Sequence, residues 1–374
     1  MMMKAMGIIS EYDPFHNGHL YQLQQAKQLT HPDATIVFMS GNWTQRGEPA
    51  IYDKWVRAQM ALENGADLVI ELPIVDAVQP ASIFAQRAVN LVSSMKCSYL
   101  SFGSEHSDWD FMKLATVTIG KSNEFHDYRY TYPELFRRTV KKQSGIDLNQ
   151  PNDTLAFWYA KANRQLSFPL KLIPIKRYAS GHNSDKLAGK IASGKAIRSA
   201  IRSHDDSYQK FIPRSSVHIE TEKPLFWSDF WPYLRYELTQ SSLSDLGRIY
   251  QMREGLEYRL KQAAIKDQTY DSFMTDIKTK RYTYTRLQRL LVYTLFQMTE
   301  TEMANSRQVI RVLGMNQNGR NYLNQVKKTV RFPIVDRIGK DAFNKTLEIE
   351  CHSGILYGML NGRIQDKFTH PIMI

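Results

Sequence analysis

The sequence predicts an α/β protein in which helices cover both faces of a parallel sheet, followed by a mainly α-helical C-terminal part. Residues 1–105 alternate short, almost continuously apolar runs with helical patterns. Such runs are typical of parallel strands, which are buried on both faces. After about residue 205 the alternation stops and long helical patterns predominate. We therefore expect two domains, residues 1–204 and residues 205–374, which suits a chain of this length.

The expected strands cover residues 4–9, 35–39, 67–72 and 99–102, with helices between them over residues 19–29, 53–64 and 81–95. Right-handed crossovers then give a doubly wound, Rossmann-like sheet. Ligands of such sheets bind beyond the carboxyl ends of the strands. The loops that follow the four strands should therefore meet at one edge. Another strand is expected over residues 170–175, and later helices over residues 243–264, 271–277 and 285–299.

The composition indicates a basic protein without features of a membrane or secreted chain. The 374 residues carry a formal net charge of +12 at pH 7. A basic surface attracts polyanions, of which nucleic acid is the usual candidate, although a merely basic enzyme is the alternative. No apolar stretch is long enough to span a bilayer, and Cys97 and Cys351 make neither a metal-binding spacing nor a disulfide framework. We expect a cytoplasmic protein that contacts no membrane and shows no evident protein partner.

Two histidines stand where the first helix is expected to begin. The first apolar run is followed by a turn at Asp13-Pro14 and then by His16-x-Gly18-His19. Residues three apart share one face of a helical turn. The backbone N–H groups at a helix start are unpaired and the helix dipole is positive there, so the place favours phosphate. The histidines add donors and, if protonated, charge, whereas a pair of surface histidines at a helix cap is the alternative.

A second helix start of this kind is expected near Ser193, in the run Ile191-Ala192-Ser193-Gly194-Lys195-Ala196-Ile197-Arg198. The sequence contains neither the Gly-x-Gly-x-x-Gly of dinucleotide-binding proteins nor a P-loop.

Two basic segments are candidate RNA contacts. Residues 125–143 place Arg137, Arg138, Lys141 and Lys142 among aromatic side chains, and residues 278–289 contain five cations, Lys280 and Arg281 among them, and no acid. Cations can meet phosphates while rings stack on unpaired bases. A solvated helix face is the alternative.

Five blocks of sequence carry a resemblance to a known family. They are Glu11-Tyr12-Asp13-Pro14-Phe15-His16-Asn17-Gly18-His19-Leu20, Met39-Ser40-Gly41-Asn42-Trp43-Thr44-Gln45-Arg46-Gly47-Glu48-Pro49, Asp67-Leu68-Val69-Ile70-Glu71-Leu72-Pro73, Phe102-Gly103-Ser104-Glu105 and Gln150-Pro151-Asn152. In this order they resemble the tRNA(Met) cytidine acetate ligases, a bacterial family of the nucleotidyltransferase-like α/β superfamily. The resemblance implies that ATP activates acetate as acetyl-adenylate, with release of pyrophosphate. The acetyl group would then pass to N4 of cytidine 34 of elongator tRNA(Met), with Mg²⁺ expected beside ATP.

The resemblance also implies the site residues. His16, His19 and Arg198 would stabilise charge during attack on the α-phosphate. The ATP-binding residues would be Gly7, Ile8, Ile9, Ser10, Glu11, Tyr12, Asp13, Pro14, Phe15, His16, Asn17, Gly18, His19, Leu20, Gly103, Asn152 and Arg177. Arg46 and Lys54 are further candidates to hold acetate or tRNA.

The chain departs from the family pattern at two places. Asp13 stands where the family usually has Asn, and Gly194-Lys195 where it usually has Ala-Thr. The sequence names no general base for acetyl transfer. Two other functions are open at this point: a small-molecule adenylyltransferase, and an RNA-binding protein with an inactive nucleotide fold.

Overall fold

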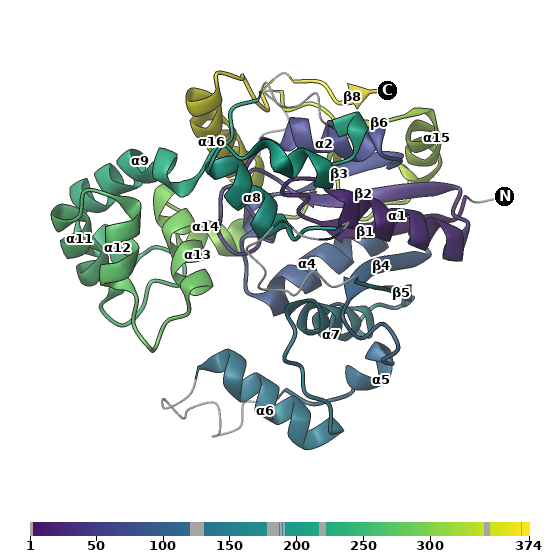
Figure 1. Ribbon diagram of the computed structural model, residues 1–374, viewed down its shortest axis with the longest axis horizontal. Coiled ribbons are helices and arrows are strands. Elements are labelled where there is room, and N and C mark those ends of the chain that lie inside the picture. Colours follow the sequence, from purple (N-terminus) through teal and green to yellow (C-terminus); the bar gives the residue numbers. More distant parts are fainter. Residues whose placement is uncertain are drawn as a thin grey trace.

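An eight-stranded sheet forms the centre of the structure, a computed structural model that describes residues 3–119, 131–177, 187, 189, 191–216, 222–339, 345–367 and 369–374. The strands are β1 Ala5–Ser10, β2 Ala34–Ser40, β3 Leu68–Leu72, β4 Tyr99–Ser104, β5 Lys171–Lys176, β6 Ile310–Met315, β7 Ile334–Val335 and β8 Ile372–Met373. Their order is β5-β4-β1-β2-β3-β6-β7, and β8 also pairs with β6 (Figure 1). The pairings are parallel except that of β3 with β6, which is antiparallel.

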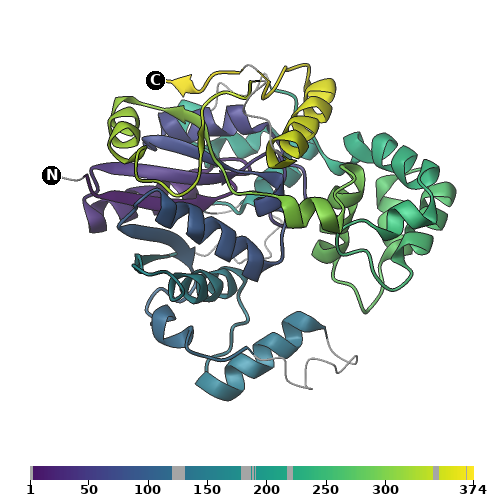
Figure 2. The same ribbon diagram turned by 180° about the vertical axis from the view of Figure 1, so that it is seen from behind.

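Helices cover both faces of the sheet, as the apolar strands require (Figures 1 and 2). The helices around the sheet are α1 Asn17–Thr30, α2 Lys54–Glu63, α3 Ile74–Ala77, α4 Ala81–Ser94, α5 Phe111–Leu114, α6 Tyr132–Ser144, α7 Pro151–Asn163, α8 Gly194–Arg202, the 3₁₀ helix η2 Asp206–Phe211, α15 Gln317–Val326 and α16 Lys345–Asn361. Alternate residues of β2 face opposite ways: Ile36 and Phe38 pack with α4, α7 and α15, whereas Val37 and Met39 pack with α2. The predicted fold class is therefore confirmed, with the antiparallel pairing as an addition.

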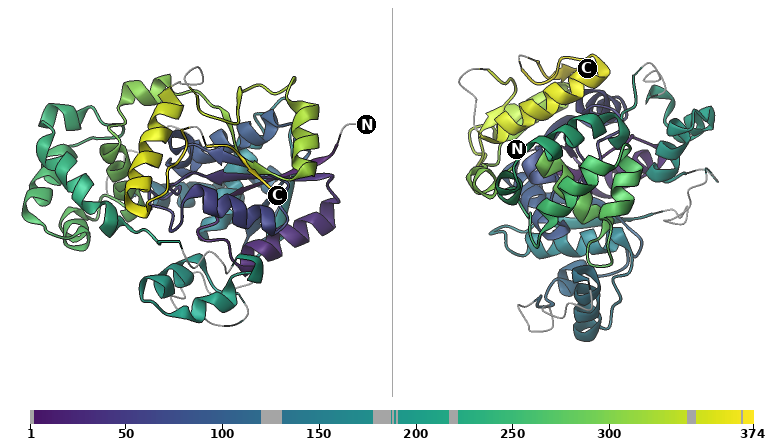
Figure 3. Two further views of the ribbon diagram at one scale, coloured as in Figure 1. Left: turned by 90° about the horizontal axis from the view of Figure 1, so that it is seen from above. Right: turned by 90° about the vertical axis from the view of Figure 1, so that its left-hand side faces the viewer.

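A group of short helices lies to one side of the sheet (Figure 1). It consists of α9 Trp227–Gln240, α10 Leu243–Gly247, α11 Leu256–Lys266, α12 Tyr270–Ile277, α13 Tyr284–Leu295 and α14 Glu300–Asn305. The group has its own aromatic core, in which Phe230 and Phe273 are fully buried. Ile349 and Tyr357 of α16 also pack into this core, so that α16 joins the helical group to the sheet (Figure 3).

The sheet does not end at the predicted domain boundary, residue 205. After the helical group the chain returns to the sheet as β6, next to β3. In the sequence, Arg311 interrupts the apolar run of β6, and for this reason the run was not predicted as a strand. In the structure Arg311 is fully buried, donates from Nη1 to the carbonyl of Asp336 at 2.7 Å and lies over the Trp55 ring. Those contacts allow a cation to occupy a central strand position.

Lys54, the first residue of α2, joins three parts of the chain through buried charge. Its Nζ lies 2.7 Å from Glu71 of β3, 2.8 Å from Glu350 of α16 and 2.7 Å from Asp366, and all four side chains are fully buried. Burial lowers the pKa of Lys54, but the three carboxylates outweigh that effect and raise it. The expectation that Lys54 holds acetate or tRNA is therefore wrong, because no solvent or ligand reaches the ammonium group.

We predict that Lys54→Met lowers the free energy of unfolding by about 3–5 kcal/mol, because it leaves buried carboxylates without a cation. Urea denaturation of both proteins measures the difference. Lys266→Met is the matched control, since Lys266 pairs with Asp276 at 2.7 Å on the surface and its removal should change stability little. Equal stability of Lys54→Met and the parent chain would show that the cluster does not hold the three segments together.

Candidate functional site

The two predicted histidines cap α1 by binding the backbone. The imidazole of His16 accepts a hydrogen bond at Nδ1 from the N–H of Gly18 at 3.0 Å, and His19 accepts at Nδ1 from the N–H of His16 at 3.3 Å. The two rings stack with centroids 3.7 Å apart. His16 thus takes the N-cap place that a serine has in an ordinary capping box, and His19 takes the place of the glutamate three residues later.

This capping determines the protonation of both rings. A ring nitrogen that accepts a hydrogen bond carries no proton, so the neutral imidazoles carry their proton on Nε2. Burial, with the positive charge of Arg177 and Arg198, lowers the pKa of His16 to about 3. Burial and the neighbouring His16 lower the pKa of His19 well below its usual range. Burial and capping therefore favour a pair of uncharged N–H donors over the protonated form that the sequence left open.

Gly18 is required by the close packing of the His16 ring and Ile191 around it. A Cβ at this position would lie 2.8 Å from Cε1 of His16 and 3.1 Å from the side chain of Ile191. A larger residue would displace the imidazole that caps the helix.

Aromatic residues of the same loop support His19 from behind. The ring of Tyr12 lies 4.8 Å from that of His19, and the ring of Phe15 lies 5.8 Å from it. Tyr12 has a φ of 47°, a left-handed conformation that is rare for an aromatic residue. Arg57 of α2 holds the loop in this shape, because its guanidinium donates to the carbonyl of Glu11 at 2.6 Å and to that of Ser40 at 3.1 Å.

Asp13 does not face the place where phosphate is expected. Its carboxylate accepts from the N–H of Ile51 at 2.7 Å and lies 3.4 Å from Nη1 of Arg198. Arg198 also donates to the carbonyl of Asp13 at 2.8 Å, and its other amino group lies 3.4 Å from Glu48. The negative charge at this departure from the family pattern is therefore balanced by Arg198.

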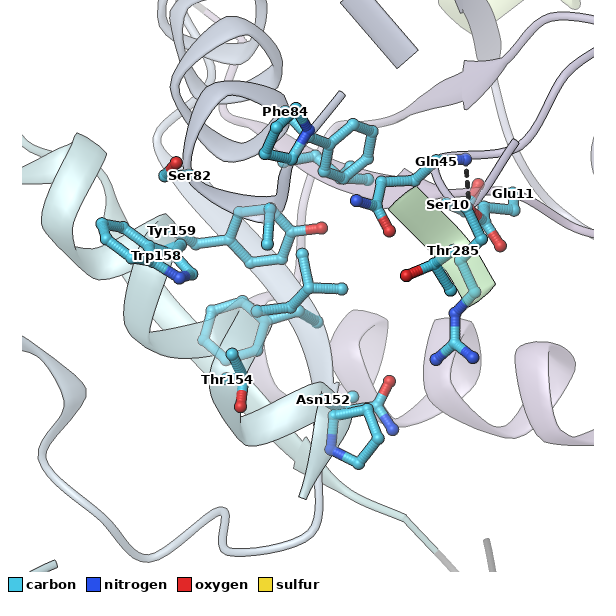
Figure 4. A pocket seen from close by; sticks show the side chains of 18 of the residues that line it. Ser10, Glu11, Gln45, Ser82, Phe84, Asn152, Thr154, Trp158, Tyr159 and Thr285 are labelled. Atoms are coloured by element: carbon cyan, nitrogen blue, oxygen red, sulfur yellow. Dashed lines mark hydrogen bonds between the residues drawn. The ribbon is translucent and has the colours of Figure 1, made fainter. Parts of the chain in front are cut away.

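A cavity of about 580 Å³ opens beyond the carboxyl ends of β1 and β4 (Figure 4). Ser10 at the end of β1, Glu11 after it, His19 in the first turn of α1 and Gly103 near the end of β4 line it. A smaller cavity of about 40 Å³ adjoins it and is lined by His16 and Gly18. Four residues line both cavities: His19, Gln22, Gly103 and Arg177. His19 thus lies between the two cavities, and His16 borders the smaller one.

The comparisons with known proteins agree over the whole chain. A model of the HIGH nucleotidyl transferase family matches residues 3–370. The tRNA(Met) cytidine acetate ligase of Lactiplantibacillus plantarum is 43% identical over 99% of this chain and 98% of its own length. That of Limosilactobacillus reuteri is 43% identical over the full length of both proteins. This chain belongs to the tRNA(Met) cytidine acetate ligase family. Crystal structures of Thermotoga maritima TmcAL match the full length of both chains, with TM-scores of 0.90 (apo, 28% identity) and 0.87 (bound with alpha-thio ATP, 27% identity).

In this member of the ligase family the three predicted ATP contacts outside the first loop lie together. Gly103, Asn152 and Arg177 all line the larger cavity. Glu105, for which the sequence predicted no role, contacts two of these residues. It accepts a hydrogen bond from Asn152 Nδ2 at 2.6 Å and lies 3.8 Å from Arg177 Nε. A Cβ at Gly103 would lie 3.3 Å from the Arg177 side chain, so the glycine lets the arginine pack against the strand.

The predicted first loop divides between the cavities and the core. Ile9, Ser10, Glu11 and His19 line the larger cavity, and His16, Gly18 and His19 line the smaller one. Tyr12 and Phe15 support the rings, and Gly7 lies inside β1, where a Cβ would be 2.7 Å from Val92. Asn17 donates to the carbonyl of Lys210 at 3.1 Å, and Leu20 packs in the core beside α8. ATP binding by this loop stays a prediction. Only some of the residues 7–20 that were predicted to bind ATP line either cavity.

Glu11 is the acidic residue that lines the larger cavity. One of its oxygens accepts from the N–H of Gln45 at 2.8 Å. Burial raises the pKa of Glu11, against the opposing effect of the nearby Arg46. Arg46 lines the cavity as well, and its role in holding acetate or tRNA stays a prediction.

The two basic segments approach the same cavity from different sides. α6 contributes Tyr132, Pro133 and Phe136 to the lining, and the second segment contributes Thr283, which caps α13, and Thr285 and Arg289 within α13. Several predicted tRNA contacts carry acidic neighbours: Arg137 pairs with Asp147, Arg138 with Glu134 at 3.0 Å, Lys141 with Asp147 at 3.7 Å and Arg281 with Glu254 at 2.6 Å. Lys142 and Lys280 are exposed. Residues 125–130 of the first predicted segment lie outside the described residues.

The expected magnesium ion has no dedicated protein cage in the part of the chain that the structure describes. No group of three or more histidine, cysteine, aspartate or glutamate side chains there could hold a metal ion. Among the described helices, none combines the length and apolar character needed to cross a bilayer.

We predict that His16 and His19 are both neutral Nε2–H tautomers between about pH 5 and pH 8. Their folded-state pKa values are lowered, so neither ring takes up a proton as the pH falls through the ordinary histidine range. ¹⁵N NMR of histidine-labelled protein measures this directly, and His16→Asn and His19→Asn assign the two signals. A ring that titrates near its ordinary pKa would contradict the capping geometry.

Proposed function

We propose that the chain is an ATP-dependent ligase that acetylates N4 of the wobble cytidine of elongator tRNA(Met). The observation that carries the proposal is the pair of uncharged histidine donors at the start of α1, which opens on two adjoining cavities. Membership in the ligase family supports acetate, ATP and tRNA(Met) as the substrates.

In the first step an acetate oxygen attacks the α-phosphorus of ATP, and the bond to the pyrophosphate oxygen breaks. Acetate is already a nucleophile at neutral pH, so the protein has to position the reactants and stabilise the charge that develops. His16 and His19 donate from Nε2 to the phosphate oxygens. Arg177 adds a fixed positive charge beside them, since it lines both cavities. Bound Mg²⁺ would neutralise the leaving pyrophosphate.

Arg198 takes part from a tethered position. Its guanidinium keeps its bond to the carbonyl of Asp13, and it binds the β- or γ-phosphate by exchanging the partly exposed Glu48 carboxylate for it. The same side chain thus positions the first loop and contacts the nucleotide.

In the second step the N4 amine of cytidine attacks the acetyl carbon of acetyl-adenylate. The bond to the AMP phosphate oxygen breaks, and the amine loses one proton. Glu11 lines the cavity and has a raised pKa, which suits a carboxylate that takes up that proton.

Radiolabelled acetate tests the proposal. The protein, ATP and total bacterial tRNA should give acid-stable label in tRNA(Met) without acetyl-CoA. We predict that His19→Ala lowers acetate-dependent ATP–pyrophosphate exchange by about 10²- to 10³-fold, because an oriented donor to the developing charge is lost. Binding of tRNA by this variant should be unchanged. His352→Ala, at an exposed position of α16, is the control. ATP turnover without label in tRNA would favour a small-molecule adenylyltransferase, and full exchange by His19→Ala would remove the histidines from the mechanism.

The basic segment before α13 should contribute to tRNA affinity. We predict that Lys280→Glu combined with Arg281→Glu weakens binding and reduces the salt dependence of the binding constant by about one phosphate contact for each side chain that meets the backbone. Fluorescence anisotropy at several salt concentrations measures the slope. Lys171→Glu is the control, because the exposed Lys171 is the first residue of β5 and lies at the end of the sheet away from the carboxyl ends of the parallel strands. An unchanged slope would exclude the segment from the tRNA interface.

A further inference from the structure

The loop after β4 and the first turn of α7 are fastened together by two carboxylates. Asp153 of α7 accepts at Oδ1 from the N–H of Glu105 at 2.9 Å, and Glu105 accepts at Oε2 from the N–H of Asp153 at 3.2 Å. Each carboxylate thus binds the backbone of the other residue. Because the two bonds run in opposite directions, neither segment can shift along the other without losing one of them.

Asp153 holds this loop from inside the protein. The residue is fully buried, and its carboxylate also accepts from Oγ of Ser104 at 2.7 Å and from the N–H of His106 at 3.1 Å. Its second oxygen lies 2.6 Å from Nδ1 of His106. The backbone on both sides of Glu105 is therefore fixed, and so is the position from which the Glu105 side chain extends.

Glu105 is the partner that the predicted ATP contacts share. Its Oε1 accepts from Nδ2 of Asn152 and lies near Nε of Arg177. Burial lowers the pKa of Arg177, and the Glu105 carboxylate opposes that effect. Gly103 directly precedes the fastened loop, and the N–H of Arg177 donates to the carbonyl of Ser104 at 3.0 Å. Gly103, Asn152 and Arg177 therefore form one unit with Glu105.

The carboxylate of Glu105 also determines which way the amide of Asn152 points. An ionised carboxylate can only accept hydrogen bonds, whereas an amide has a donating end and an accepting end. Nδ2 of Asn152 must therefore face Glu105, because the reversed amide would place two oxygens against each other. Figure 4 shows Asn152 at the border of the larger cavity, with its oxygen on the side of the open space. The residue thus presents an acceptor to a bound nucleotide.

The surroundings of Asn152 suit the ring of a nucleotide base. Trp158 and Tyr159, which follow it on α7, line the same cavity, whose volume of about 580 Å³ lies in the range of small-molecule and cofactor sites. Adenine carries an amino group at the 6-position of its ring, which donates, whereas guanine and hypoxanthine carry an oxygen there, which accepts. An acceptor that faces this position favours adenine, because a 6-oxopurine would leave two oxygens facing each other without a donor.

We propose that Glu105 is a positioning residue that sets the nucleotide selectivity of the site: it holds the amide of Asn152 with its oxygen toward the 6-amino group of ATP. Glu105 itself need not touch the nucleotide. The inference rests on the proposed function for ATP as the nucleotide, and it adds the residue that makes the site discriminate between adenine and a 6-oxopurine.

Glu105→Gln tests the positioning with ATP and inosine triphosphate, which differ only at the 6-position of the ring and in the hydrogen on N1. Glutamine can turn either its oxygen or its nitrogen toward Asn152, so both directions of the Asn152 amide become possible. The ratio of kcat/KM for ATP to kcat/KM for inosine triphosphate, measured by acetate-dependent pyrophosphate exchange, should fall by about 5- to 150-fold, the range for one buried polar group left unpaired. Glu105→Asp should keep the ratio, because aspartate also only accepts, even where its shorter side chain raises KM for both nucleotides.

Glu134→Gln is the matched control, since Glu134 pairs with Arg138 at 3.0 Å on the surface of α6. Asn152→Ala is a second variant, which removes the acceptor and should lower the ratio with Glu105 in place. Adding Glu105→Gln to Asn152→Ala should then leave the ratio where it is, because Glu105 acts through the amide. Thermal denaturation establishes that each variant is folded.

Three results would overturn the positioning role. One is an unchanged ratio in folded Glu105→Gln. Another is an equal loss of activity with both nucleotides, which is what a purely structural role would give. The third is a ratio that falls as far in Glu105→Asp as in Glu105→Gln, because a partner that only accepts would then not be the cause of the selectivity.

Calorimetric binding of the two nucleotides, without acetate or tRNA, separates this inference from the proposed function. If the parent chain prefers ATP, Glu105→Gln reduces that preference and no label appears in tRNA, the ligase is refuted and the role of Glu105 stands. Label in tRNA, together with equal affinity of the parent chain for both nucleotides, supports the ligase and overturns the role of Glu105.

Discussion

Buried charge around Lys54 holds the parts of this protein in one arrangement. The ammonium group lies among three carboxylates that come from β3, α16 and the segment before β8, far apart in the sequence. α16 also packs into the core of the helical group, which supplies Thr283, Thr285 and Arg289 to the cavity. The geometry of the cavity therefore depends on an ion cluster that no substrate touches.

The strands that position the site could be predicted because each is a short, almost uninterrupted apolar run. β2 and β3 are buried along their whole length, and the sequence shows them directly. β6 could not be found in this way, because Arg311 breaks its pattern and the contacts that make a buried cation tolerable come from Trp55 and Asp336. The domain division at residue 205 remains a prediction, while the sheet itself continues beyond it.

The site was predictable to the extent that its chemistry is local in sequence. The two histidines, the glycine between them and the helix start lie within four residues, and the structure brings Gly103, Asn152 and Arg177 to the same cavity. Lys54 was misjudged because a lysine after a strand has the same appearance whether it faces a ligand or three buried carboxylates. The aromatic lining of the larger cavity was not recognised, because Trp158 and Tyr159 lie on a helix whose apolar residues are equally consistent with a core. Only the fold shows which of them border a space.

The use of Nδ1 by the backbone has a consequence for product release. Two imidazolium ions would attract pyrophosphate as strongly after the bond to the α-phosphorus has broken as before, and they would retain it. Neutral Nε2–H donors act through direction and lose their hold once the phosphate geometry changes. If the histidines bind phosphate as proposed, a capping arrangement that serves the start of a helix would also favour turnover, because it would keep the site from retaining its own leaving group.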